Sequence, residues 1–219
     1  MSRPRQPIHI AVMGHSFLAA HQKLYRPTYD YLSQHPDVTS FYLHGISGLL
    51  YADTNQLLDG MHEARYRPNS IVLVLGDNDM TFKSGAPRDD MRMDTFPSAF
   101  HQRRADAVAL CETVAGVGRV LSTVPFPRFQ VKRGKLVYNP LIPHNRIAAQ
   151  YIQKLPTFRP GNSLPFVRQK HMVPYKRGRS LYPRTPDKSL FKTKDGIHPA
   201  LGSFDELLKP ILEDWIARC

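Results

Sequence analysis

Short apolar runs of strand length dominate the hydrophobic pattern of the chain. The clearest is Ser-Ile-Val-Leu-Val-Leu at residues 70–75. A continuous run of this kind is typical of a strand in the centre of a parallel sheet whose two faces are both covered. The same criterion predicts further strands at residues 8–12, 38–43, 119–124 and 164–167. Residues 130–137 are predicted to form a small strand or hairpin arm.

Segments with helical spacing of apolar residues alternate with these strands. Pro27 predicts a kink or a late start in the first helix, and Ser203 with Glu206 has the spacing of a capping box before the last one. Residues 168–194, rich in Pro, Arg and Lys, are predicted to form an extended loop. The predicted helices are at residues 18–35, 54–63, 97–114, 145–155 and 203–218.

The alternation of strands and helices predicts an α/β fold. We expect a three-layer α/β/α sandwich with a central, mostly parallel sheet of about five strands. At 219 residues the chain is long enough for one domain with a sizeable core. Because no repeat or linker is visible, we predict a single domain over residues 1–219, with a basic, Pro-rich insertion around residues 126–190.

The basic charge is concentrated in that insertion. The net charge is +12, and the 74 residues between Glu112 and Asp187 carry 14 Lys or Arg and no acid. The rest of the chain holds 30 − 14 = 16 bases against 18 acids. Some of these bases alternate with tyrosines, a pattern that suits nucleic acid or another polyanion, an anionic membrane surface, an acidic protein partner, or simply a solvated loop. The candidate polyanion-binding residues are Arg133, Lys135, Lys176, Arg177 and Arg179.

Two features predict an intracellular protein. No apolar run is long enough to span a bilayer, and the N-terminus lacks the apolar stretch of a signal peptide. The two cysteines, Cys111 and Cys219, do not form a disulfide framework.

Four polar or glycine-containing motifs follow predicted strands or precede the last helix. They are Gly-His-Ser at 14–16, Gly-Ile-Ser-Gly at 45–48, Gly-Asp-Asn-Asp at 76–79 and Asp-Gly-Ile-His at 195–198. In an open parallel sheet the carboxyl ends of the strands meet at one edge, where ligands bind. Together the motifs supply the hydroxyl, imidazole, carboxylate and amide that acyl transfer requires.

Each motif alone has a structural interpretation, as a turn or a helix cap. A metal site is the alternative chemistry, because Asp77, Asp79, Asp195 and His198 could bind a divalent cation. No Cys or His spacing typical of zinc is present. We therefore predict neither a metal nor a cofactor, and interpret Asp79 as structural.

In this order, the four motifs resemble those of the SGNH (GDSL-type) hydrolase superfamily, over most of residues 8–125 and 189–217. The resemblance implies an SGNH or flavodoxin-like sandwich with esterase activity. It implies that Ser16 is the nucleophile, His198 the base and Asp195 the residue that orients the imidazole. The implied oxyanion hole consists of the backbone N–H groups of Ser16 and Gly48 and the side-chain amide of Asn78.

The chain departs from the family pattern at His15, which replaces the usual aspartate between Gly14 and Ser16. The residues that supply the chemistry in the four motifs are kept, so this replacement bears on local hydrogen bonding more than on catalysis. Gly45 is a weaker alternative to Gly48. No Gly-x-Ser-x-Gly motif is present, which argues against an α/β-hydrolase.

The sequence therefore predicts a serine hydrolase of SGNH type, an esterase or deacylase that acts on a small O-acyl or lipid-like ester. The alternative is a binding module that keeps the SGNH fold and binds nucleic acid or another polyanion through its basic segment. An association with retroelement proteins would suit that alternative.

Overall fold

A computed structural model describes most of the chain. The described residues are 6–79, 96–123, 128–139, 145, 172–177, 180–186, 188–192 and 194–219.

Within the described residues, the centre of the fold is a sheet of four parallel strands, and its order is β2-β1-β3-β4. The strands are β1 (Ile8–Gly14), β2 (Val38–Gly45), β3 (Ser70–Val74) and β4 (Val120–Ser122). The predicted strand at 164–167 and the predicted helix at 145–155 lie outside the described residues, apart from residue 145.

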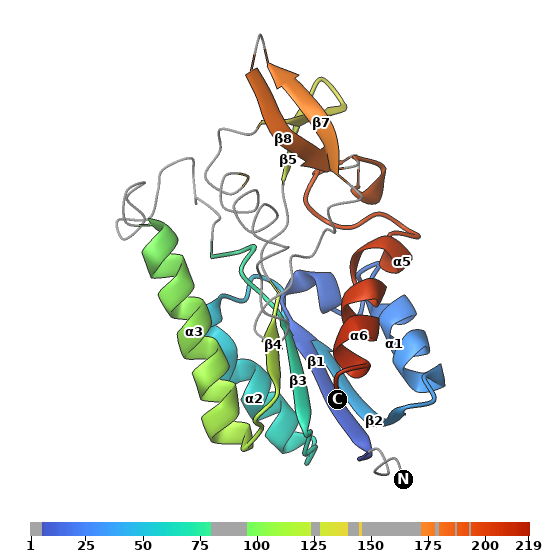
Figure 1. The fold of residues 1–219 in the computed structure, drawn as a ribbon, viewed down its shortest axis with the longest axis vertical. Coiled ribbons are helices and arrows are strands. Elements are labelled where there is room, and N and C mark those ends of the chain that lie inside the picture. The colour runs from blue at the N-terminus through green and yellow to red at the C-terminus, as the bar shows by residue number, and fades with distance from the viewer. Residues whose placement is uncertain are drawn as a thin grey trace.

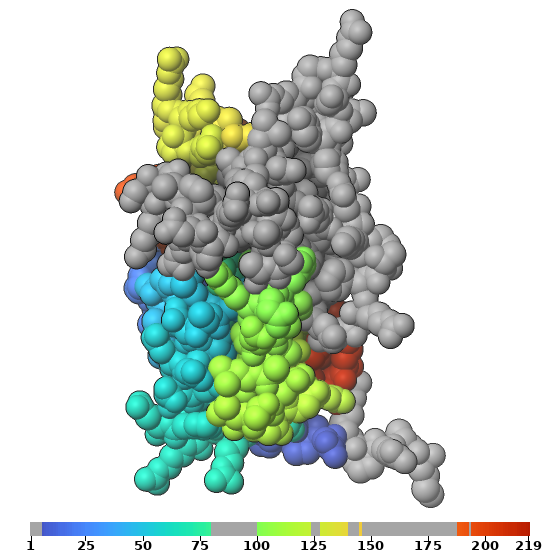
Figure 2. All heavy atoms as spheres, turned by 90° about the vertical axis from the view of Figure 1, so that its left-hand side faces the viewer, coloured from blue at the N-terminus to red at the C-terminus, as the bar shows by residue number. Residues whose placement is uncertain are grey.

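Helices cover both faces of this sheet (Figure 1). One face carries α1 (Tyr25–Gln34), α5 (Phe204–Leu207) and α6 (Lys209–Ile216). The other carries α2 (Thr54–Glu63) and α3 (Phe96–Ala115), which lie side by side in Figure 2. The predicted three-layer sandwich is confirmed.

The period of two along the strands explains this arrangement. In β1, Ile10 and Val12 belong to the core cluster that contains Leu212 of α6. Ala11 and Met13, which point the opposite way, belong to the cluster around α2 and α3. Because each strand supplies apolar side chains to both clusters, the sheet is stable only when both faces are covered.

The first predicted helix agrees with the structure and the last one does not. After the 3-10 turn η1 (Ser16–Leu18), α1 begins only at Tyr25, so Pro27 lies in its first turn and the predicted late start is confirmed. The single helix predicted over 203–218 is wrong. In the structure this segment is divided into α5 and α6, and Pro210 lies in the first turn of α6.

The predicted capping box does not form, because the Ser203 hydroxyl donates to the backbone oxygen of Ala200 at 2.7 Å instead of capping α5.

The described part of the basic segment contains two antiparallel hairpins. The first, β5 (Phe129–Lys132) with β6 (Lys135–Tyr138), confirms the strand or hairpin arm predicted at 130–137. The second, β7 (Met172–Arg177) with β8 (Ser180–Pro186), replaces the predicted loop. Pro174 lies where the register shifts, and a proline is tolerated at such an irregularity because no ladder hydrogen bond is required there.

The division of the chain into one domain with an insertion at 126–190 stays a prediction. None of the helices in the described part of the chain has the length and apolar character needed to cross a membrane.

Gly45, at the end of β2, lies against the backbone that follows Ser16. A Cβ atom there would overlap the backbone of Leu18 and Ala19. We expect Gly45→Ala to lower the free energy of unfolding by at least about 2 kcal/mol, because the neighbouring backbone must move. Gly118→Ala is the control, since a Cβ on Gly118 meets no atom within 4 Å. Urea denaturation of both variants measures the difference, and equal losses would contradict the prediction.

Candidate active site

The turn after β1 is fixed by both neighbouring strands. Gly14 leaves no room for a side chain, because a Cβ would overlap the carbonyl of Val74 at the end of β3. The backbone N–H of His15 donates to Val74 O at 3.1 Å, and that of Ile46 donates to Gly14 O at 2.9 Å. Ser16 therefore begins η1 at a defined position on the carboxyl edge of the sheet.

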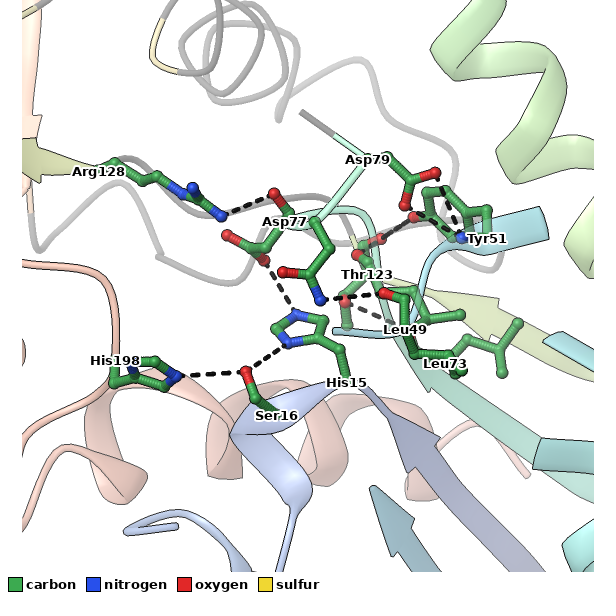
Figure 3. A network of polar contacts seen from close by, with 12 residues as sticks. His15, Ser16, Leu49, Tyr51, Leu73, Asp77, Asp79, Thr123, Arg128 and His198 are labelled. Carbon is green, nitrogen blue, oxygen red and sulfur yellow. Dashed lines mark hydrogen bonds and ion pairs between the residues drawn. The ribbon is translucent and has the colours of Figure 1, made fainter. Parts of the chain in front are cut away.

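The structure brings Ser16, His198 and Asp195 together at this edge, and Figure 3 shows the first two of them. The Oγ atom of Ser16 lies 3.3 Å from Nε2 of His198. The Nδ1 atom of His198 lies 2.9 Å from Oδ2 of Asp195. An ionised carboxylate only accepts hydrogen bonds, so Nδ1 carries the imidazole proton and the lone pair of Nε2 faces the serine hydroxyl.

A tight loop holds the imidazole of His198 and its carboxylate. Oδ1 of Asp195 accepts the backbone N–H groups of Ile197 at 2.8 Å and His198 at 2.9 Å. Gly196 provides the left-handed residue of this turn, with φ +67°. Partial burial raises the pKa of Asp195, but the hydrogen bonds from Ile197 and His198 outweigh it and lower the pKa below its ordinary value.

A second histidine, His15, also contacts the serine; the sequence alone left open whether this imidazole is packed, on the surface or functional. Nδ1 of His15 lies 3.4 Å from Oγ of Ser16, and its Nε2 lies 3.2 Å from Oδ2 of Asp77. Neither His15 nor Asp77 is among the residues that the sequence motifs assign to the serine hydrolase site. The available signal was that an imidazole directly precedes the serine, where the family has a carboxylate.

Phe17 and Arg128 surround these two imidazole–carboxylate pairs. The ring of Phe17 meets His15 edge-on at 4.3 Å and His198 at 5.7 Å between centroids. Nη2 of Arg128 donates to the backbone oxygen of Asp77 at 2.7 Å. Burial lowers the pKa of Arg128, and the carboxylates of Asp77 and Asp195 partly oppose that effect. The guanidinium thus interacts electrostatically with both carboxylates.

Gly48 and Asn78, two of the three predicted oxyanion residues, lie on two loops that contact each other. Gly48 occupies a left-handed turn after β2, with φ +81°. The side-chain amide of Asn78 donates one hydrogen to the backbone oxygen of Leu49 at 3.0 Å, beside this turn. Asp79 accepts the backbone N–H of Tyr51 at 3.1 Å, which fits its structural interpretation.

The candidate polyanion-binding residues lie elsewhere in the chain. Arg133 is in the turn of the β5–β6 hairpin and Lys135 is in β6, while Lys176 and Arg177 are in β7. Arg179 lies outside the described residues. Lys135 lines a hollow of about 970 Å³ that Ser16 and His198 do not line; the lining includes the lysines Lys23, Lys135, Lys188, Lys192 and Lys194.

Within the described ranges, no three His, Cys, Asp or Glu side chains are grouped so that they could hold a metal ion.

Comparison with known proteins identifies the fold. No family model matches the sequence, and no curated protein matches it. The acetylxylan esterase Axe2 from Geobacillus stearothermophilus matches the structure with a TM-score of 0.54, at 16% identity over 95% of this chain and 94% of Axe2. TesA matches with a TM-score of 0.53, at 16% identity over 94% of this chain and 97% of TesA.

The fold is that of the SGNH-type hydrolases. The resemblance inferred from the four sequence motifs is thus confirmed for the fold. The SGNH neighbours include esterases, and none of these matches supports nucleic-acid binding as the function.

Asp79 allows a test of the electrostatics beside the site. Burial raises the pKa of its carboxyl to about 6, although the hydrogen bond from Tyr51 and the charge of Arg103 lower it. A carboxyl with a raised folded pKa binds more protons in the folded than in the unfolded state, so its contribution to stability is lost as pH rises from about 4 to about 6.

We therefore compare the free energy of unfolding of Asp79→Asn with that of wild type at two pH values. We expect the difference, variant minus wild type, to be more positive at pH 7.5 than at pH 4, by at most about 3 kcal/mol. Urea denaturation at both pH values measures this difference. The exposed Asp59→Asn variant is the control. A stability difference between Asp79→Asn and wild type that is the same at both pH values would contradict the raised pKa.

Proposed function

We propose that this protein is a serine esterase of SGNH type that hydrolyses an O-acyl or lipid-like carboxylic ester. The observation that carries the proposal is the chain of contacts from Ser16 Oγ to His198 Nε2 at 3.3 Å and from His198 Nδ1 to Asp195 at 2.9 Å. A serine becomes a strong nucleophile only beside a base that can take its proton. His198 is such a base, and Asp195 fixes its tautomer.

In the acylation step, the Oγ atom of Ser16 forms a bond to the acyl carbon while its proton moves to Nε2 of His198. The carbon–oxygen bond to the alcohol then breaks, and the imidazolium returns the proton to the departing alcohol oxygen. In the deacylation step, His198 takes a proton from water, whose oxygen attacks the acyl carbon. The bond between the acyl carbon and Ser16 Oγ breaks, the carboxylic acid leaves, and His198 returns the proton to Oγ. The His198 side chain is 27% exposed, which gives it access to that water.

The negative charge that develops on the carbonyl oxygen requires donors at fixed positions. We assign this role to the backbone N–H groups of Ser16 and Gly48 and to the second amide hydrogen of Asn78. The hydrogen bond from Asn78 to Leu49 O supports the assignment, because it orients the amide beside the Gly48 turn.

The comparison with Axe2 supports the same residues. Three Axe2 structures are described as catalytic mutants, in which an aspartate, a serine or a histidine is replaced by alanine. The aspartate and the histidine of Axe2 are three residues apart, as Asp195 and His198 are here. Because Axe2 is an acetylxylan esterase, acetyl esters are the first substrates to test.

Ser16→Ala tests the nucleophile. We expect a fluorophosphonate probe, which forms a covalent bond to activated serines, to label wild type and Ser33→Ala but not Ser16→Ala. Ser33 is an exposed hydroxyl on α1 and serves as the matched control. Labelling is measured by intact mass. If wild type takes up no probe and cleaves no acetyl ester, the proposed function is wrong.

Asn78→Ala tests the oxyanion hole. We expect kcat for p-nitrophenyl acetate to fall by about 10²–10³ with little change in KM, because the donor acts on charge that develops in the transition state. Asn55→Ala, an exposed position on α2, is the control. A rise in KM at unchanged kcat would instead assign Asn78 to substrate binding.

A further inference from the structure

Two imidazole–carboxylate pairs converge on one serine hydroxyl. Ser16 Oγ lies 3.3 Å from Nε2 of His198 and 3.4 Å from Nδ1 of His15. These distances are equal within 0.1 Å, and hydrogen bonds of this kind commonly shorten when substrate binds. The mechanism described above uses only the His198 pair.

The partner of His15 determines which nitrogen faces the serine as an acceptor. Nε2 of His15 lies 3.2 Å from the Asp77 carboxylate. A carboxylate accepts, so Nε2 carries the proton of the neutral ring and Nδ1 presents its lone pair to Ser16. This is the arrangement that Asp195 imposes on His198, with the two ring nitrogens exchanged.

The two pairs differ in their access to water. Side-chain exposure is 1% for His15 and 3% for Asp77, but 27% for His198 and 36% for Asp195. Phe17 packs its ring edge-on against His15. A buried imidazole can exchange a proton with the adjacent hydroxyl, but it cannot activate a water molecule that arrives from solvent.

We propose that His15, oriented by Asp77, is a second general base for Ser16 that supports acylation but not deacylation. This inference rests on the proposed function, because it requires Ser16 to be the nucleophile. In the step assigned to His15, the Ser16 oxygen forms a bond to the acyl carbon and the hydroxyl proton moves to Nδ1 of His15. The bond to the leaving group breaks, the leaving group departs as an anion such as fluoride or nitrophenolate, and the resulting imidazolium stays paired with the Asp77 carboxylate.

Fluorophosphonate labelling isolates this first half of the reaction. The Oγ–P bond forms, the P–F bond breaks, and fluoride leaves without needing a proton, so no second proton transfer or water is required. We expect His198→Ala to be labelled about 10²–10³ times more slowly than wild type, since one base is lost. We expect the double variants H198A/D77N and H198A/H15N to be labelled at least about tenfold more slowly again.

The D77N change keeps the shape of the side chain but alters the hydrogen bonding that fixes the His15 tautomer, so it tests the base and not the packing. H198A/H21A is the matched control, because His21 is exposed, and it should be labelled at the rate of His198→Ala. Thermal melts of each variant report whether the fold is retained.

A second measurement needs no double variant. With p-nitrophenyl acetate, His198→Ala should release about one equivalent of nitrophenolate, which leaves as an anion and needs no proton. The acetyl group should then remain on Ser16, and intact mass should detect it. Ser16→Ala should show no acetylation.

The outcomes separate this inference from the proposed function. A wild type that takes up no probe and cleaves no acetyl ester rejects both. If wild type is labelled but His198→Ala forms no acetyl-enzyme, only the role of His15 is rejected. The same holds if His198→Ala is labelled no faster than the two folded double variants. Labelling of His198→Ala that is lost in H198A/D77N, together with a trapped acetyl group, supports it.

Discussion

The close approach of β1 and β3 at their carboxyl ends determines the geometry of the site. Gly14 has no Cβ, which lets the chain pass beside the carbonyl of Val74, and the N–H of His15 donates to that same oxygen. This contact places residues 15 and 16 next to the loop that contains Asp77. A side chain at position 14 would separate the two strand ends and with them the hydroxyl and the buried carboxylate.

The remaining part of the site lies in the loop at residues 192–198, whose own hydrogen bonds hold its conformation. Asp195 binds two backbone N–H groups and the ring of His198 within one turn of chain. The backbone of Lys192 further closes the loop, because its N–H donates to His198 O at 2.8 Å. Carboxylate and imidazole are therefore oriented before the loop meets the serine, so only the placement of the whole loop depends on tertiary packing.

This difference explains how much the sequence could predict. The strands were visible because apolar runs such as 70–75 must be buried on both faces, and the pairing of Asp195 with His198 spans only three residues. The contact between His15 and Asp77 joins residues 62 positions apart, and no local pattern indicates it. The β7–β8 hairpin was missed because its proline and basic residues resemble a loop, and the break between α5 and α6 was missed because the apolar stripe continues past Pro210.

The contact between the β5–β6 hairpin and Gly196 has a practical consequence for protein engineering. The backbone N–H of Phe129 donates to Gly196 O at 3.0 Å, and a Cβ on Gly196 would overlap the same residue. The start of the basic segment therefore packs against the turn between Asp195 and His198 and supports it. Excising the whole segment to obtain a shorter protein would remove that support, whereas a truncation that retains residues 128–139 would preserve it.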